Sequence, residues 1–259
     1  MKNQFLFILL ISFSTFSQEF IEASFIEESS LQTDKLVYID NFDTSYTIKD
    51  NVFYKKNALK SISYNNIQLG TITTAHAFNP LKINLFYKDF NTVIILDNRL
   101  AEIFKIDFNS LEPFRNVSHC STGNDNTIWI FNQNTQQLEV FDYKLNKTRS
   151  KSLPIQEEVI AMASNYNYCW ILTKNTLYSY NYFGILLSKI THSGFTNMVE
   201  SDGNIILQKG NFLYYLKKDK NQPIPINSPN LLINQFLVTN ETLYIYNDEI
   251  LQKFQLKTN

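Results

Sequence analysis

Few residues in this sequence could bind a metal ion. The candidates are His76, His119 and Cys120, and the last two are adjacent. A zinc site usually combines several His, Cys or carboxylate ligands with further residues that orient them. Neighbouring residues on a strand point to opposite faces, so Cys120 would not join His119 in one site. We therefore expect no metal site.

Carboxylates suited to catalysis are also scarce. Glycoside cleavage requires two carboxylates about 5–10 Å apart. The adjacent pairs Glu27-Glu28 and Glu157-Glu158 would point to opposite faces of a strand, so they are expected to be solvated charges. The sequence has no Gly-x-Ser-x-Gly motif and no glycine-rich phosphate loop. It predicts no catalytic residue and no cofactor.

The charge balance gives no basis for nucleic-acid binding. The chain has 23 Lys and Arg residues against 24 Asp and Glu residues, a net charge of −1. Nucleic-acid affinity depends on clustered basic residues. The three arginines, Arg99, Arg115 and Arg149, are dispersed, so no arginine cluster for a carboxylate ligand is expected.

One sequence pattern recurs six times, and the strands that it predicts would carry the histidines, cysteines and charged residues described above. It consists of an alternating apolar segment, a polar turn and a second alternating segment, and it recurs at intervals of 36 to 45 residues. The equivalent positions are Val52, Val93, Leu138, Leu177, Leu213 and Leu251. A steady period near forty residues indicates a repeat architecture.

Each unit has room for four strands. In the third unit we expect strands at residues 117–121, 127–132, 137–143 and 147–153, with period-2 alternation of apolar residues. Two-residue turns with positive φ are expected at Asp50-Asn51, Lys174-Asn175, Gly210-Asn211 and Asn247-Asp248. Four-stranded antiparallel units at this period are typical of β-propeller blades, and a solenoid of hairpins is the alternative.

The two ends of the chain indicate how the ring closes. The last unit, residues 234–255, has only three strands, whereas residues 20–27 form a strand-like segment without a partner. We therefore predict an all-β fold: a six-bladed β-propeller of four-stranded antiparallel blades, closed by the N-terminal strand joining the last blade. Seven blades is the alternative. Cys120 and Cys169 fall in different repeats and are expected to be buried, unpaired thiols.

A resemblance supports this fold. The segment STGNDNTIWIFN at residues 121–132, with the echoes SNYNYCWIL and SDGNIILQ, resembles the turn-strand signature of bacterial exported propellers with quinoprotein-like, NHL-like or regulator-type repeats. The resemblance implies a fold and no reaction. Lactonase-type members hold calcium with inward carboxylates, but the inner strands here end in only Asp40 and Glu200.

Propellers usually act at the mouth of their central channel. On this strand assignment the innermost strands carry His76, His119, Met162 and Met198, which are expected to line the channel. The longer loops could bind a protein instead. The candidate residues are Leu111, Glu112, Phe114 and Arg115 in one loop, and Ile224 and Ile226 in another.

The first 17 residues have the form of a secretory signal, leaving residues 18–259 as a single propeller domain without a transmembrane segment. We expect a monomer exported to the periplasm or cell surface. The favoured function is a non-enzymatic, protein-binding scaffold of the bacterial cell envelope, for which the resemblance offers envelope-assembly propellers as a model. The alternative is a propeller that binds or hydrolyses a carbohydrate or lactone at its channel. A sensor module is a third possibility.

Overall fold

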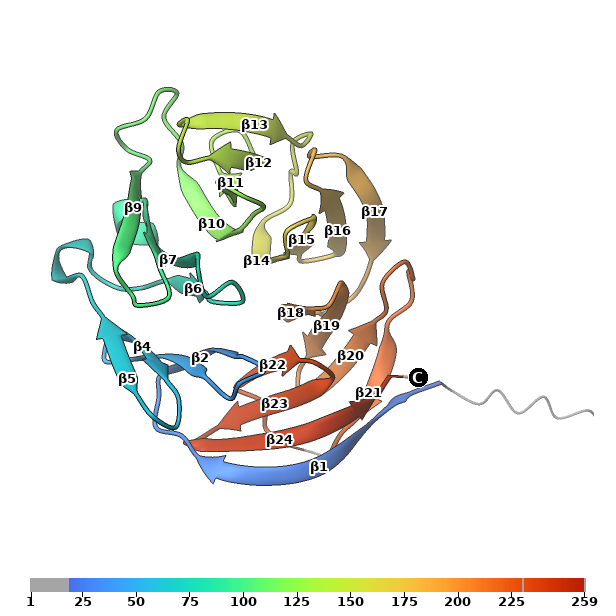
Figure 1. Cartoon of the computed structure of the whole chain (residues 1–259). Coiled ribbons are helices and arrows are strands. Elements are labelled where there is room, and N and C mark those ends of the chain that lie inside the picture. Colours follow the sequence, from blue (N-terminus) through green and yellow to red (C-terminus); the bar gives the residue numbers. More distant parts are fainter. Residues whose placement is uncertain (1–18, 230, 259) are drawn as a thin grey trace, which may run out of the picture.

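The computed structural model describes residues 19–229 and 231–258, which form 24 strands and two short 3-10 helices arranged as a ring (Figure 1). The predicted signal segment lies outside the described residues. Within the described residues no helix is both long enough and apolar enough to span a membrane.

Four sheets are separate four-stranded blades whose strands follow chain order. The first blade has β2 (Lys35–Ile39), β3 (Ser45–Lys49), β4 (Val52–Lys56) and β5 (Ser61–Tyr64). The second has β6 (Thr74–His76), β7 (Ile83–Tyr87), β8 (Thr92–Leu96) and β9 (Glu102–Asp107). The third has β10 (Val117–Thr122), β11 (Thr127–Asn132), β12 (Gln137–Asp142) and β13 (Lys147–Lys151). The fourth has β14 (Val159–Ser164), β15 (Tyr168–Thr173), β16 (Thr176–Asn181) and β17 (Leu186–Thr191).

The other eight strands form one continuous sheet in the order β18-β19-β20-β21-β1-β24-β23-β22. Its members are β18 (Asn197–Ser201), β19 (Asn204–Lys209), β20 (Phe212–Leu216), β21 (Ile224–Asn227), β1 (Ile21–Ser30), β24 (Ile250–Lys257), β23 (Thr242–Asn247) and β22 (Gln235–Thr239). The 3-10 helices η1 (Ile67–Leu69) and η2 (Lys88–Phe90) lie in connections.

The prediction of six separate four-stranded blades is therefore wrong, because only four sheets are four-stranded. The cause is β1, which pairs on both of its edges. It is antiparallel to β24 from Glu22 to Ser30, and it is also parallel to β21 through Ile21 and Glu22. The sequence indicated a partner for one edge of this segment but gave no sign of the second.

The burial of each strand follows its place in a blade. Every residue of β7, β8 and β11 is buried, since these middle strands have a neighbouring blade on each face. The outer strand β13 alternates between exposed and half-buried residues. Apolar clusters fill the spaces between adjacent blades; in one of them Phe86 and Val93 pack with Phe141 of the next blade.

The strands predicted in the third unit are confirmed to within two residues at each end, whereas the predicted turns are confirmed only in part. Asp50 and Asn51 have φ of 49° and 62°, as predicted. The last hairpin is shifted by one residue, to Asp248 and Glu249. Lys174 and Asn175 are not in the left-handed region, because the Thr173 hydroxyl accepts a hydrogen bond from Thr176 N and stabilises another turn.

Candidate functional site at the channel mouth

The innermost strands are β2, β6, β10, β14, β18 and β22, and each contacts the next around the centre of the ring (Figure 1). The chain turns back after each of these strands at the same end of the ring. These turns surround the mouth of the central channel. Two adjoining hollows lie there and share Tyr38, Asn41 and Phe78. We call them together the channel-mouth site.

The inner hollow has a volume of about 420 Å³. Its wall combines carboxylate and amide side chains with aromatic rings. The carboxylate and amide members are Asn41, Asn165, Asn167, Glu200, Asp202 and Asn240, the aromatic members are Tyr38, Phe78, Tyr166 and Tyr168, and Lys218, Ser201 and Thr239 also line the hollow. Phe78 and Tyr166 meet edge to face, with ring centroids 5.2 Å apart. The combination offers flat apolar surfaces next to hydrogen-bonding groups.

Glu200, near the end of β18, is held in place in the inner hollow by two hydrogen bonds. Its Oε1 accepts hydrogen bonds from Asn165 Nδ2 and from Gly203 N, both at 2.8 Å. Its Oε2 accepts none from the residues that the structure describes. Burial raises the pKa of Glu200, although the two donors lower it. The free oxygen is available to a ligand in the hollow.

The outer hollow, of about 490 Å³, is more apolar. Tyr38, Phe42, Tyr46, Phe78, Pro80 and Leu81 line it. Phe42 and Leu81 stand on the turns after β2 and β6, with 86% and 65% of their surfaces exposed. Asp40 does not act as a free carboxylate, since its Oδ1 accepts hydrogen bonds from Phe42 N and Thr44 N at 2.9 Å.

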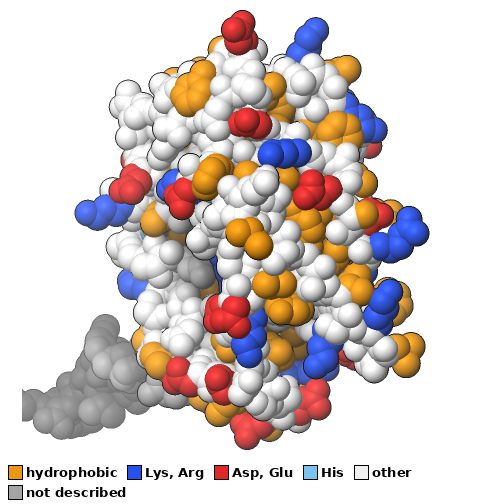
Figure 2. Space-filling view, turned by 90° about the vertical axis from the view of Figure 1, so that its left-hand side faces the viewer, with side chains coloured by type: hydrophobic (Ala, Val, Ile, Leu, Met, Phe, Trp, Pro, Cys, Tyr) orange, Lys and Arg blue, Asp and Glu red, His pale blue; other side chains and the backbone are white. Residues whose placement is uncertain are grey.

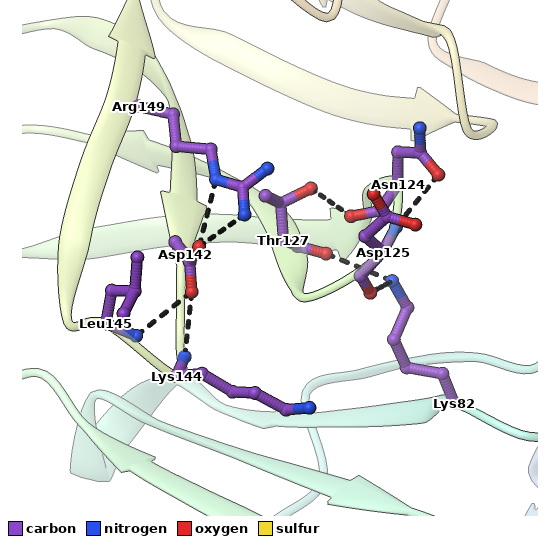
Figure 3. A network of polar contacts seen from close by, with 8 residues as sticks. All are labelled: Lys82, Asn124, Asp125, Thr127, Asp142, Lys144, Leu145 and Arg149. Atoms are coloured by element: carbon purple, nitrogen blue, oxygen red, sulfur yellow. Dashed lines mark hydrogen bonds and ion pairs between the residues drawn. The ribbon is translucent and has the colours of Figure 1, made fainter.

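A buried lysine fixes the turn after β10 next to this site (Figure 3). Lys82 Nζ donates hydrogen bonds to the backbone oxygens of Gly123, Asp125 and Thr127, at 2.6, 2.8 and 3.2 Å. Burial lowers the pKa of Lys82 to about 8, and Asp125 raises it. In the third blade, the Asp142 carboxylate stabilises the β12–β13 turn. It accepts hydrogen bonds from Lys144 N, Leu145 N and the Arg149 guanidinium. These contacts fix the conformation of two turns in the third blade.

The histidines predicted to line the channel lie on inner strands but not in either hollow. His76 Nδ1 is 3.4 Å from Ser121 Oγ, and His119 Nδ1 is 2.9 Å from Ser118 Oγ. Burial lowers the pKa of both imidazoles to about 4. Each also hydrogen-bonds the backbone of the next inner strand, at Cys120 and Ile160 respectively. They connect inner strands to one another.

The two methionines that were predicted to line the channel, Met162 and Met198, pack against apolar clusters between blades. Met198 is buried in the cluster between β15–β16 and β19, and Met162 packs against the neighbouring cluster that contains Ile171. Cys120 and Cys169 are buried and form no disulfide bond with each other. Among the described residues, no group of three or more His, Cys, Asp or Glu side chains is placed to hold a metal ion.

The predicted loop residues do not form one exposed surface. Arg115 is buried, and its Nε donates to Glu139 at 3.1 Å, so it anchors the loop to its own blade. Leu111 packs against an apolar cluster, whereas Glu112 and Phe114 are exposed. This loop precedes β10 and lies at the end of that strand opposite to the channel-mouth site.

Ile224 and Ile226 do not belong to an extended loop. They lie in strand β21, between β20 and β1. Ile226 is buried, and Ile224 packs against the same apolar cluster. Both residues therefore belong to the core. The sequence predicted a loop here because it gave no sign that β1 pairs with this segment.

Most of the channel-mouth site was missed at the level of single residues, although its position in the repeat is visible in the sequence. Phe42, Phe78, Tyr166 and Asp202 all stand in the short polar connection between the first and second strands of a unit. Comparing this one position across the repeats would have located the site.

On the rim of the ring that carries β5 and β9, hydrophobic side chains are interspersed with charged ones (Figure 2).

No protein-family model matches the sequence, and no curated protein matches it. Solved structures of bacterial β-propeller proteins are similar in fold. Virginiamycin B lyase from Staphylococcus aureus is 11% identical over 92% of this chain and 100% of its own, with a TM-score of 0.62. BamB from Moraxella catarrhalis is 16% identical over 84% of this chain and 68% of its own, with a TM-score of 0.50.

PorZ, a surface component of the type-IX secretion system of Porphyromonas gingivalis, is 13% identical over 85% of this chain, with a TM-score of 0.53. The match covers 32% of the PorZ chain. At these identities the likeness shows the β-propeller fold alone.

Proposed function

We propose that this chain is an exported, non-enzymatic β-propeller that binds a protein partner in the bacterial cell envelope through its channel-mouth site. The observation that carries the proposal is the outer hollow, where Phe42 and Leu81 project from rigid turns beside a wall of aromatic rings. Exposed aromatic and apolar side chains around a concave surface are typical of protein-binding sites.

The turns that present these two side chains are held in place before any partner arrives. Asp40 accepts hydrogen bonds from the backbone on both sides of the Phe42 turn. Asn79 Oδ1 accepts one from Leu81 N at 3.0 Å, and Asn79 O accepts one from Lys82 N at 3.0 Å. A pre-organised surface loses little conformational entropy on binding, which favours affinity.

The envelope location rests on the secretory signal predicted for the first 17 residues and on the kind of proteins that share the fold. One of these, PorZ, is a bacterial surface component of a secretion system. We expect the exported protein to be a monomer without its partner, which size-exclusion chromatography with light scattering would test.

The direct test is affinity capture from cell-envelope extracts. We expect the wild-type protein to recover a specific partner and the variant Phe42→Ser/Leu81→Ser to lose it. The control variant is Ile67→Ser/Leu153→Ser, which changes two side chains of comparable exposure in connections at the other end of the blades. Equal recovery of the partner by all three proteins would refute the proposed binding surface.

Carbohydrate binding is a second candidate, because six carboxylate or amide side chains and four aromatic rings line the inner hollow. Saccharides are bound by such combinations of flat apolar surface and hydrogen-bonding groups. Calorimetric titration with neutral oligosaccharides tests it. Saturable binding that Tyr166→Ala and Glu200→Gln abolish, together with failure of the capture experiment, would replace the first proposal by the second.

A further inference from the structure

A groove lies between the fourth blade and the β18–β21 part of the eight-stranded sheet, and it adjoins the inner hollow, with which it shares Tyr168, Gly203 and Lys218. It has a volume of about 290 Å³. Its floor is apolar and consists of Trp170, Leu177, Ile205 and Leu216, all buried residues of one cluster. None of these four lines either hollow of the channel-mouth site.

Positive charge surrounds one end of this groove. Lys217, Lys218 and Lys220 line it from the β20–β21 connection, where Asp219 is the only acidic residue. None of the three lysines takes part in an ion pair within the described part of the chain. Lys218 Nζ lies 5.7 Å from the centroid of the Tyr168 ring, which also lines the groove. The local charge favours an anion.

Trp170 contributes the largest apolar surface to the floor of the groove. Only 8% of its surface is exposed. Its indole Nε1–H donates to no residue that the structure describes, yet this atom is not among the fully buried polar atoms without partners. Buried tryptophans usually find an acceptor for this group. The indole N–H of Trp170 therefore has its hydrogen-bonding capacity left to solvent, and the flat ring face supplies the apolar surface.

We propose that this inter-blade groove binds a small amphipathic carboxylate with an unbranched hydrocarbon chain, of the fatty-acid class. The hydrocarbon lies on the floor formed by Trp170, Leu177 and Leu216. The carboxylate lies at the lysine end, where it accepts hydrogen bonds from the ammonium groups. The groove is too small for a protein segment of ordinary interface size, so a small molecule fits it better than an acidic peptide.

Tryptophan fluorescence of the purified protein measures the binding directly, because Trp170 forms part of the floor, while the other tryptophan, Trp129, is buried in a different cluster between the third and fourth blades. Three ligands of equal chain length are compared: decanoate, decanol and decyltrimethylammonium. We expect decanoate to bind most tightly. Each methylene added from hexanoate to decanoate is expected to lower Kd about fourfold until the groove is filled.

Two variants locate the site. Lys217→Gln/Lys218→Gln/Lys220→Gln is expected to raise Kd for decanoate about tenfold and to leave Kd for decanol unchanged. Trp170→Phe is expected to remove the fluorescence response, and calorimetry then measures its affinity. The matched control, Lys144→Gln/Lys147→Gln/Lys151→Gln, changes three exposed lysines around the β12–β13 turn and should bind decanoate like the wild type.

Equal affinity for the anionic, neutral and cationic ligands would overturn the proposal, as would equal loss in both lysine variants. Binding of an acidic peptide without binding of decanoate would assign the groove to a protein partner and would also overturn it. The floor of the groove and the exposed residues of the outer hollow do not overlap, so Trp170→Phe tests the groove independently of the partner-capture experiment, whereas Lys218 also lines the inner hollow.

Discussion

Arg115 illustrates how one side chain can combine the features of a binding residue with a purely structural position. Its guanidinium donates to Glu139, to Pro113 O and to Thr148 Oγ1, and it lies 5.0 Å from the centroid of the Phe141 ring. Asn132 Nδ2 donates to the second carboxylate oxygen of Glu139. The pair is thus buried with its hydrogen bonds satisfied, which is the condition under which a buried ion pair is tolerated.

We predict that Arg115→Met lowers the free energy of unfolding by about 3–5 kcal/mol, because it leaves the Glu139 carboxylate buried without its cation. Arg115→Met/Glu139→Leu should recover much of this loss. Urea denaturation of the single and double variants gives the values. Arg99→Met is the control, since Arg99 is exposed and its solvent-screened ion pair with Asp97 should contribute little to stability. Equal effects at both arginines would show that Arg115 is not an anchor.

At the scale of elements, the inner strands depend on polar contacts as well as on packing. Ser121 Oγ and Ser164 Oγ lie 2.6 Å apart across β10 and β14, and Thr239 Oγ1 donates to Ile39 O at 2.9 Å across β22 and β2. His76 and His119 add links from β6 to β10 and from β10 to β14. These links join strands that belong to different blades.

The histidine links predict a dependence of stability on pH. The folded protein holds both pKa values near 4, whereas the ordinary value is 6.5. Between these values the unfolded chain binds more protons, so the free energy of unfolding falls as pH falls from 6.5 to 4. The loss should be on the order of 2 kcal/mol per histidine at pH 4, after a reduction for partial exposure.

The measurement is urea denaturation at several pH values between 4 and 7. His76→Gln/His119→Gln keeps a side-chain donor for the backbone contacts but does not titrate. Its stability should therefore decline less steeply than that of the wild type below pH 6.5. Parallel curves for the two proteins would show that the imidazoles are not the groups responsible.

The strands were predictable because alternating apolar residues and turn-forming asparagines are local signals. Asp50-Asn51 is such a case, since both residues tolerate the left-handed conformation that the hairpin requires. Local signals fail where a distant element decides. Ile226 has the sequence surroundings of a loop, but β1 pairs with its strand from the other end of the chain. Arg115 is likewise removed from solvent by residues that follow it by more than twenty positions.

For the whole molecule, β1 is the element on which closure depends. Ile21 lies at the junction of β21, β1 and β24 and is 5% exposed, while Ile26, at the bulge in the same strand, is 46% exposed. The bulge separates the pairs Phe25–Phe254 and Glu27–Lys253. The two isoleucines thus form a natural pair for comparison.

We predict that Ile21→Ala lowers the free energy of unfolding by about 2–4 kcal/mol and that Ile26→Ala changes it by less than about 0.5 kcal/mol. Removal of residues 20–27 should destabilise the whole domain. Thermal unfolding followed by far-ultraviolet circular dichroism tests all three proteins. A truncated protein with the same melting temperature as the full one would contradict a role of β1 in holding the ring together.

The double pairing of β1 also orders events during synthesis. The first strand leaves the ribosome before any other, yet both of its partners, β21 and β24, come from the last forty or so residues. Its hydrogen-bonding edges must therefore stay unpaired until β21 and β24 have been synthesised, and contacts of such long sequence separation form slowly. A product that stops short of Ile250 would lack β24 and would leave β1 and β23 each with one unpaired edge, and such open edges favour aggregation.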